Sequence, residues 1–235
     1  MTRAEKLITI AENEPKVYEA GMSQRESEMW DMIQDYGNRS DYAHAFKAWS
    51  AEYIRPKYKI TSTHYNGLNM TFYMCPDLKK VEKAYFDFSQ KATSTNQASG
   101  AYYTFADNPL LEEVEDIGLV AGYGMTYTFL NCKALKKIAR IIVDENSIYN
   151  NAFRNCEALE EVYFDGVIGK NFDIHWSKLL SADSLDSIIT HLSDTATGQT
   201  ITLPTTAEAN YDAVYGEGAW AALVATKPNW TFAYA

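Results

Sequence analysis

Cysteine and histidine are the residue types that most often carry nucleophilic or metal chemistry in proteins. The chain has three cysteines, Cys75, Cys132 and Cys156, and four histidines. None of these residues lies at the short spacing of a C-x-x-C or H-E-x-x-H metal site. The sequence also lacks the G-x-S-x-G of a nucleophile elbow and the G-x-x-x-x-G-K-[ST] of a phosphate-binding loop. We therefore expect no catalytic residue, no metal ion and no cofactor.

Carboxylates are the other groups that could do chemistry, because a glycosidase holds two of them on opposite sides of a sugar. Asp165 and Asp173 are close in the sequence, but nothing in the pattern places them across a cleft. Acidic residues are also numerous, with 31 Asp and Glu against 21 Lys and Arg. An enzyme acting on surface glycans is therefore the least favoured function, and we expect a protein that is not an enzyme.

The net charge of −10 argues against two classes of partner. Nucleic acid and anionic membranes both carry phosphate, which repels an acidic chain. No stretch approaches the roughly 20 apolar residues that span a bilayer. The first residues also lack the apolar core of a signal peptide. We expect synthesis in the cytoplasm, no nucleic-acid binding and no membrane insertion.

A ten-residue pattern recurs through the middle of the chain. It reads FYMCPDLKKV from Phe72, FADNPLLEEV from Phe105, FLNCKALKKI from Phe129 and FRNCEALEEV from Phe153. The period of 24 to 33 residues falls in the range of leucine-rich repeats. Each unit predicts a turn or a short helix followed by a strand, and stacking at about 4.8 Å per strand would build a continuous core.

Two features of the pattern predict that the repeats stack in register. The fourth position holds Cys75, Asn108, Cys132 and Cys156, which we expect to form a buried row. The eighth and ninth positions alternate between Lys-Lys and Glu-Glu from one repeat to the next. Stacking in register would place opposite charges side by side, for about 0.2–1 kcal/mol per exposed pair. The charged positions also fit a solvated face, and neither interpretation makes them a binding site.

The repeats resemble the leucine-rich repeats of the BspA type, whose core reads F-x-N-C-x-x-L-x-x-V/I. The repeats from Phe129 and Phe153 match that core, and the other two depart from it at the Asn or Cys positions. This resemblance covers residues 72–177. The whole chain is similar, more loosely, to leucine-rich-repeat proteins of gut-bacterial phages and prophages. That likeness rests on EKLITIAENEPKVYEAG, WDMIQDYGNRSDYAHAF, LEEVYFDGVIGKNFDIHWSKLL and NWTFAY. It implies a structural or host-recognition protein of a phage tail.

The residues before the repeats predict helices. The first helix places Leu7, Ile10, Val17 and Tyr18 at helical spacing. This face either packs on its own domain or serves for attachment and self-association. A capping box at residues 23–26 predicts a second helix, and a third is expected from residue 41 to about residue 53.

The residues after the repeats predict a mixed α/β unit. We expect a helix from Ser181 to about Leu192, a strand at residues 200–203, and a helix opened by Thr205 and Glu208. A further helix from Ala219 and a final strand in NWTFAY complete the unit. Because the end of a repeat stack exposes apolar edges, such a unit is the expected cap. Trp220 and Trp230 are expected in its core.

The predicted fold class is therefore α+β, with a short leucine-rich-repeat solenoid of four coils between N-terminal helices and a C-terminal cap. The predicted domains are a helical attachment or oligomerisation segment at 1–58, the solenoid at 59–177, and a mixed α/β cap at 178–235.

Candidate binding residues come from the turns between repeats, which are rich in tyrosine, asparagine, serine and glycine. Surfaces of this composition often serve adaptable recognition, including stacking on sugars. Alternatively, some of the rings pack inward and fill the core. The candidates for ligand or receptor binding are Tyr102, Tyr103, Tyr123, Tyr127, Tyr149 and Trp176.

The predicted function is that of a non-enzymatic virion protein in a phage tail, baseplate or fibre. It would contact a bacterial surface glycan or protein through the repeat loops, and other virion proteins through the N-terminal helices. Self-association is a further expected contact, with a trimer as one form considered. The alternative is an interaction or adhesion module of a bacterium. The missing secretion signal favours the virion, because a surface adhesin needs such a signal whereas a virion part leaves by lysis.

Overall fold

The structure, a computed structural model, describes residues 46–50, 52–54, 60–61, 69–82, 86–87, 101–115, 117–120 and 124–235. The strands are β1 (Tyr53–Ile54), β2 (Ile60–Thr61), β3 (Lys80–Val81), β4 (Phe86–Asp87), β5 (Glu113–Val114), β6 (Ile117–Val120), β7 (Lys137–Val143), β8 (Glu161–Gly166), β9 (Phe172–Asp173), β10 (Gln199–Leu203) and β11 (Trp230–Tyr234). The helices are α3 (Ala182–Thr190), α4 (Ala207–Tyr215) and α5 (Ala219–Ala225). The fold is α+β, as predicted.

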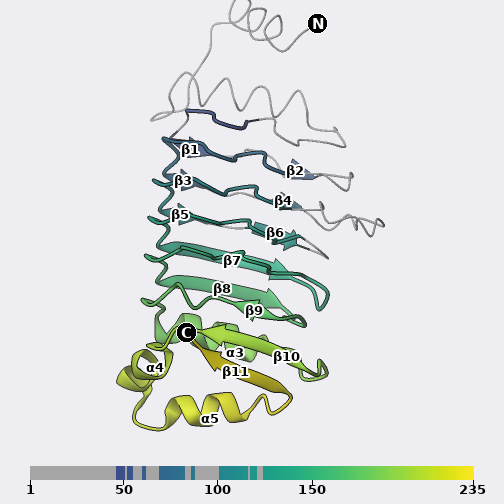
Figure 1. The fold of residues 1–235 in the computed structure, drawn as a ribbon, viewed down its shortest axis with the longest axis vertical. Helices are drawn as coiled ribbons and strands as arrows, with labels where there is room; N and C mark the ends of the chain where they lie inside the picture. Colours follow the sequence, from purple (N-terminus) through teal and green to yellow (C-terminus); the bar gives the residue numbers. More distant parts are fainter. Residues whose placement is uncertain are drawn as a thin grey trace, which may run out of the picture.

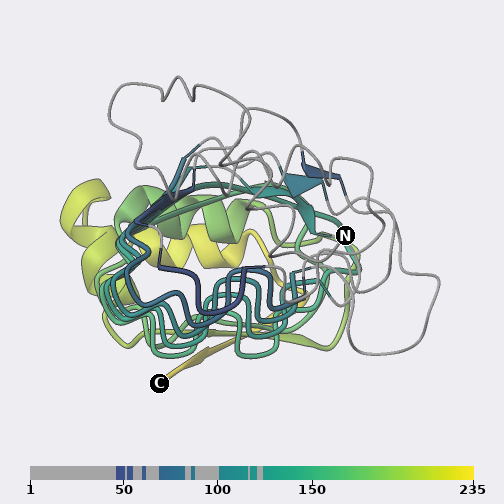
Figure 2. The same cartoon turned by 90° about the horizontal axis from the view of Figure 1, so that it is seen from above.

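Successive repeats form a column of parallel strands, which we call the coil stack (residues 46–166 as described). Strands β1, β3, β5, β7 and β8 pair in that order. Lys80, Glu113, Lys137 and Glu161 are aligned as Cα partners from strand to strand. Strand β6 pairs with the second half of β7. Figure 1 shows the strands one above another, and viewed from above the described coils superimpose (Figure 2).

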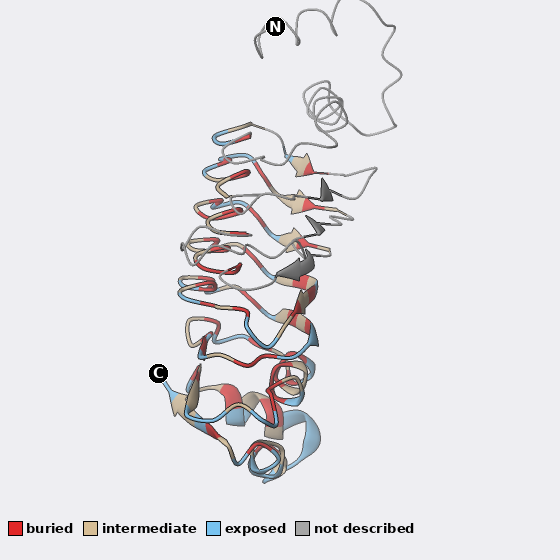
Figure 3. Ribbon diagram, turned by 90° about the vertical axis from the view of Figure 1, so that its right-hand side faces the viewer, coloured by how far each residue is buried: buried red, intermediate tan, exposed pale blue. Residues whose placement is uncertain are grey.

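A column of buried phenylalanines fills the coil stack. The rings of Phe46, Phe72, Phe105, Phe129 and Phe153 lie nearly parallel, with centroids 5.4 to 5.7 Å apart. Each ring is at most 2% exposed. Burial follows the stack from coil to coil (Figure 3). Stacked rings add about 0.5–1.5 kcal/mol per pair to the free energy gained by burying their area.

The coil around Phe46 corrects one prediction. A third helix was expected from residue 41 to about residue 53, but residues 46–48 form a turn and Tyr53–Ile54 form β1. The backbone N–H of Phe46 donates to the Thr71 carbonyl, as the Phe72 N–H donates to the Thr104 carbonyl one coil further on. Residues 46–54 therefore belong to the coil stack. The first two expected helices lie outside the described residues.

Each phenylalanine is bracketed by two left-handed backbone residues. Among the described residues, the one two places before each stacked phenylalanine has φ of 51–57°. The one two places after has φ of 55–63°. In two coils the later position is Asn, which tolerates this conformation. These side chains also link the coils, because Asn131 Nδ2 donates to Asp107 Oδ1 and Asn155 Nδ2 donates to Asn131 Oδ1, both at 2.6 Å.

The cysteine row is buried, as predicted. Each thiol donates to the carbonyl of the phenylalanine in the preceding coil, as Cys132 Sγ does to Phe105 at 3.0 Å. Burial raises the pKa of Cys75 and Cys132 to about 12, so these thiols stay protonated and unreactive. Asn108 takes the thiol's place in its coil. Its amide donates to the Phe72 and Phe105 carbonyls, and its Oδ1 accepts from the Cys75 N–H at 2.6 Å.

The alternating charges form ion pairs between neighbouring coils, as expected for stacking in register. Lys80 Nζ lies 3.0 Å from Glu113 Oε2, and Lys137 Nζ lies 2.6 Å from Glu161 Oε2. Lys136 pairs in the same way with Glu112 at 3.1 Å. Because these side chains are partly exposed, each pair contributes about 0–1 kcal/mol and mainly fixes the register.

Helix α3 closes the free edge of β8. The hydroxyl of Ser184 accepts from the Val162 N–H, and the hydroxyl of Ser187 accepts from the Phe164 N–H, both at 2.9 Å. Ser184 also donates to the Glu160 carbonyl. The two serines thus satisfy backbone groups that another strand would otherwise pair with, and the edge is protected against strand addition.

The C-terminal elements follow the predicted order. Helix α3 begins after the N-cap Ser181 and buries Leu185, Ile188 and Ile189. Strands β9, β10 and β11 form a parallel sheet below the coil stack (Figure 1). Trp220 and Trp230 are buried as expected.

The cap of α4 differs from the predicted one. The helix begins after Thr206 rather than Thr205, and no side-chain bond caps it. The Thr206 hydroxyl donates instead to the Lys178 carbonyl, at 2.7 Å. This threonine therefore ties α4 to the segment before α3 rather than capping its own helix.

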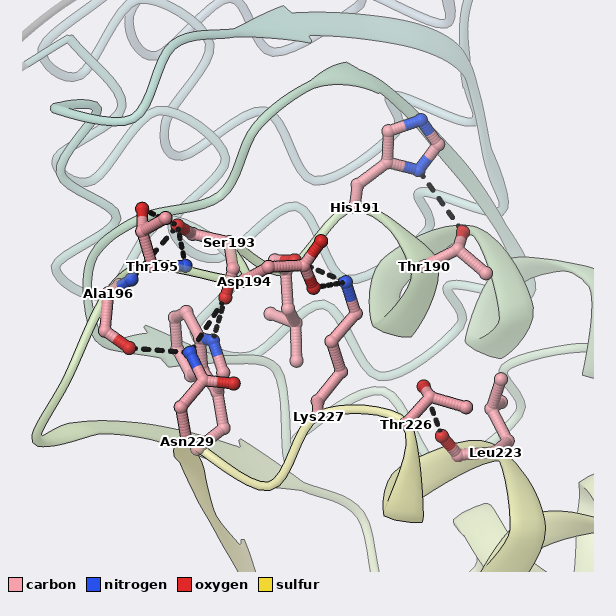
Figure 4. Close-up of polar contacts among 12 residues, drawn as sticks. Thr190, His191, Ser193, Asp194, Thr195, Ala196, Leu223, Thr226, Lys227 and Asn229 are labelled. Atoms are coloured by element: carbon pink, nitrogen blue, oxygen red, sulfur yellow. Dashed lines mark hydrogen bonds and ion pairs between the residues drawn. The ribbon is translucent and has the colours of Figure 1, made fainter.

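A buried lysine locks the C-terminal unit together (Figure 4). Lys227 is 7% exposed, and its Nζ donates to the Leu192 carbonyl at 2.6 Å and to Asp194 Oδ1 at 2.7 Å. The indole N–H of Trp230 donates to the Ser193 carbonyl at 2.8 Å. These bonds hold the loop after α3 against the segment between α5 and β11.

Replacing Asn108 tests how the coils are held in register. Asn108→Ala leaves the buried Cys75 N–H without its acceptor, so we expect the free energy of unfolding to fall by about 1–3 kcal/mol. Asn108→Cys is the matched control, because a thiol there can donate to the Phe72 carbonyl as the other cysteines do. We expect a smaller loss for it in urea unfolding followed by circular dichroism. Equal losses for the two variants would contradict this role of the side chain.

Candidate functional site

Four half-buried tyrosines meet on the turns that precede or follow the stacked phenylalanines. We call Tyr73, Tyr102, Tyr103 and Tyr127 the tyrosine cluster. The rings of Tyr103 and Tyr127 are stacked, with centroids 4.6 Å apart. Tyr102 meets both edge-on at 4.7 and 5.9 Å, and Tyr73 meets Tyr103 at 5.7 Å. Three successive coils thus present one continuous aromatic surface.

Two members of the cluster occupy a backbone conformation that disfavours them. Tyr103 and Tyr127 have φ of 52° and 57°, at the position two residues before the stacked phenylalanine. The same position holds Asn151 in the next coil. A residue with a side chain loses about 1–2 kcal/mol in this region, and Asn is the residue type that tolerates it best. Contacts between the rings offset part of that cost.

Two hydroxyls of the cluster, those of Tyr73 and Tyr103, have raised pKa values. Partial burial, together with a hydrogen bond to the Asp107 carboxylate, raises the pKa of Tyr73. Burial and the neighbouring tyrosines raise the pKa of Tyr103. The ammonium group of Lys47 lies 5.1 Å from the centre of the Tyr73 ring, within range of a cation–π contact. The surface therefore offers ring faces and phenolic hydroxyls.

A groove of about 360 Å³ opens beside Tyr127, where the coil stack meets the C-terminal sheet. We call it the polar groove, because most side chains lining it end in an amide, a hydroxyl or a carboxylate. Its lining residues are Tyr127, Tyr149, Asn150, Asn151, Asn171, Phe172, Asp173, Thr200 and Thr202.

The β10 wall of the polar groove follows from strand alternation. Thr200 and Thr202 lie on one face of β10, and the residue between them, Ile201, is fully buried on the other. Register pairs Thr202 with Asp173 of β9. Just before β9, the Asn171 Oδ1 accepts from the Thr200 N–H at 2.8 Å, which ties the two strands together.

The facing wall is the loop at residues 144–151. Asp144 Oδ1 accepts from the Asn146 N–H at 2.9 Å, forming a tight turn. Glu145 Oε1 then accepts from the hydroxyls of Ser193 at 2.9 Å and Thr195 at 3.0 Å. These bonds anchor the loop to the C-terminal unit.

The structure brings together only some of the residues expected to bind. Tyr102, Tyr103 and Tyr127 are in contact with one another. The expectation that Tyr149 projects to the surface is wrong, because it is 1% exposed and its ring packs edge-on against Phe172 at 5.1 Å. Tyr149 instead fits the alternative in which some rings fill the core, since Phe172 of β9 covers it.

The remaining candidates do not join this surface. Trp176 lies against His175, with ring centroids 4.9 Å apart, and no ring contact among the described residues links it to the tyrosine cluster. Tyr123 lies outside the described residues, as do the attachment or oligomerisation candidates Leu7, Ile10, Val17 and Tyr18.

Sequence reasoning missed Tyr73 and the polar lining of the groove. Tyr73 directly follows Phe72, the first phenylalanine of the repeat pattern. Because that phenylalanine is expected in the core, the next residue could have been expected on the surface of the turn. The Asn and Asp residues lie in the turns from which the aromatic candidates were taken, beside Tyr149 and Trp176. The alternation of residues 200–203 predicts that Thr200 and Thr202 share one face of a strand. It does not predict which segment of the chain that face would meet.

The described residues hold no group of three His, Cys, Asp or Glu side chains arranged to bind a metal ion. Within the same part of the chain, no helix has the length and apolar character needed to cross a membrane. Comparison of the chain with protein-family models, with curated proteins and with solved structures gives no match. The site is therefore interpreted from its own geometry.

The anchor of the groove loop is expected to depend on pH. Hydrogen bonds from Ser193 and Thr195 lower the pKa of Glu145. Its stabilising effect is therefore complete above the unfolded-state pKa and is lost as the pH falls through the lower folded-state value. We expect acidification from pH 7 to about pH 3 to lower the urea midpoint more in the wild type than in Glu145→Gln, whose amide does not titrate. Equal losses in the two proteins would contradict the role given to this carboxylate.

Proposed function

We propose that the chain is a recognition protein that binds a bacterial surface through the tyrosine cluster. The observation that carries this proposal is the continuous aromatic surface that Tyr73, Tyr102, Tyr103 and Tyr127 form across three successive coils. Tyrosines on a rigid scaffold bind with little loss of side-chain entropy, which suits recognition of a protein or a glycan.

We further propose that the coil stack is a leucine-rich-repeat solenoid of the BspA type and that the C-terminal unit is its cap. Parallel stacking, the period of the pattern and the buried fourth position favour that class. The pairing of β1 with β3 adds a coil to the four that the sequence pattern predicts. The serines of α3 would then be the device that ends the solenoid.

The proposed setting is a phage tail, baseplate or fibre. It rests on the resemblance of the N-terminal segment and of the ending NWTFAY to leucine-rich-repeat proteins of gut-bacterial phages. In this setting the N-terminal helices would attach the protein to other virion proteins or to copies of itself. An interaction or adhesion module of a bacterium is the alternative, and the same tyrosine cluster would serve it.

Binding of the fluorescently labelled full chain to intact gut bacteria tests the proposal. We expect saturable labelling of at least one strain in a panel. The double variant Tyr102→Ala/Tyr127→Asn should weaken that labelling at least about tenfold, because it removes two central rings. Asn is chosen at residue 127 because it keeps the left-handed backbone. Tyr215→Ala is the matched control, since it removes an exposed tyrosine on α4.

Circular dichroism must show that the double variant is folded before its binding is compared. Labelling of every strain unchanged by the double variant would contradict recognition through the tyrosine cluster, and so would an absence of labelling by the wild type. Immunogold decoration of phage tails with an antibody against the chain would distinguish the virion setting from the bacterial one.

A further inference from the structure

We propose that the polar groove binds one neutral sugar unit of the surface ligand. This inference rests on the proposed function and deepens it, because it names the class of ligand. The groove shares only Tyr127 with the tyrosine cluster. The groove's volume of about 360 Å³ lies at the small end of the range for ligand sites, about 300–1,000 Å³. It therefore suits a compact ligand rather than a folded protein segment.

The lining offers polar groups that other residues do not use. No side-chain hydrogen bond within the described residues engages the amides of Asn150 and Asn151 or the hydroxyls of Thr200 and Thr202. Amides and hydroxyls both donate and accept hydrogen bonds. A sugar ring presents hydroxyls of the same dual character on several sides. Two walls of such groups, one on the loop and one on β10, match a ligand with hydroxyls on both edges.

The charge of the groove selects a neutral ligand. Among the described residues, Asp173 is the one charged residue that lines it, and no Lys or Arg does. Asp173 Oδ1 accepts from the His175 backbone N–H at 3.2 Å and lies 2.5 Å from the His175 ring Nδ1, whereas Oδ2 has no hydrogen-bond partner among the described residues. This oxygen is placed to accept from a ligand hydroxyl, and it repels an anion. A lone carboxylate is too few for a calcium site, which gathers six to eight oxygen ligands.

Tyr127 joins the groove to the tyrosine cluster. It lines the groove and also stacks on Tyr103. A ligand longer than one sugar can therefore lie with one unit in the groove and the next against the aromatic rings. The polar groove supplies hydrogen bonds that discriminate between sugars, while the rings supply contact area.

Saturation-transfer NMR on the full chain tests the groove directly. The probes are glucose, galactose, mannose, rhamnose and N-acetylglucosamine at millimolar concentration, with glucuronate as the charged counterpart of glucose. We expect transfer to at least one neutral sugar and none to glucuronate. Thr202→Val keeps the shape of the side chain but removes its hydroxyl, and Asn150→Ala removes an exposed amide. Each should reduce the transfer at least about fivefold, because a hydrogen bond to the sugar is lost.

Thr231→Val is the matched control, since Thr231 is exposed on β11 beside Thr200 but does not line the groove. Transfer to no neutral sugar, transfer that survives both groove substitutions, or equal transfer to glucuronate would each overturn the inference. Cell labelling separates the two proposals. Labelling that depends on the tyrosine cluster while no sugar enters the groove leaves the proposed function intact and removes only the sugar site.

Discussion

Stacking of parallel coils in register is the constraint on which the rest of the structure depends. Each phenylalanine ring lies on the one before it at 5.4 to 5.7 Å, so equivalent residues of successive coils are forced into neighbouring positions. A buried cysteine or Asn108 bonds the phenylalanine carbonyl of the preceding coil, and paired charges align the strands. The same constraint places Tyr103 directly against Tyr127. The alignment of these positions is thus a consequence of register. Register does not require tyrosine there, so the residue type is the feature that we interpret as functional.

The groove exists because the stack ends. The ring of Phe172 meets that of Phe153 at 87° instead of lying parallel to it, and β9 leaves the column to pair with β10. A new sheet therefore begins beside the last full coil, and the loop at residues 144–151 faces it. Serine hydroxyls of helix α3 bond the backbone at the edge of β8. In the loop after α3, the Leu192 carbonyl accepts from Lys227 and the Ser193 hydroxyl donates to Glu145. The end of the stack thereby gains a concave polar site that no regular coil could form.

Much of this fold could be predicted from the sequence, because the repeat pattern and the helix and strand signals after it are local. The coil at Phe46 was missed because Trp49 stands near the cysteine position and the segment from Phe46 to Ile54 is one residue shorter than that from Phe72 to Val81. Burial of Tyr149 depends on what covers the last coil, which no repeat pattern encodes. The groove could not be predicted either, since its walls come from segments about 50 residues apart.

The central claim is that recognition takes place along the turns of the coil stack and the polar groove, not on the charged strand face. Mapping amide shifts by NMR on the isotope-labelled full chain, while adding envelope polysaccharide from a strain that the protein labels, tests this claim most directly. We expect shift changes centred on Tyr102, Tyr127, Asn150 and Thr202, with the residues of α4 and α5 unaffected. Changes centred on the Lys and Glu positions of β3, β5 and β7 would contradict it.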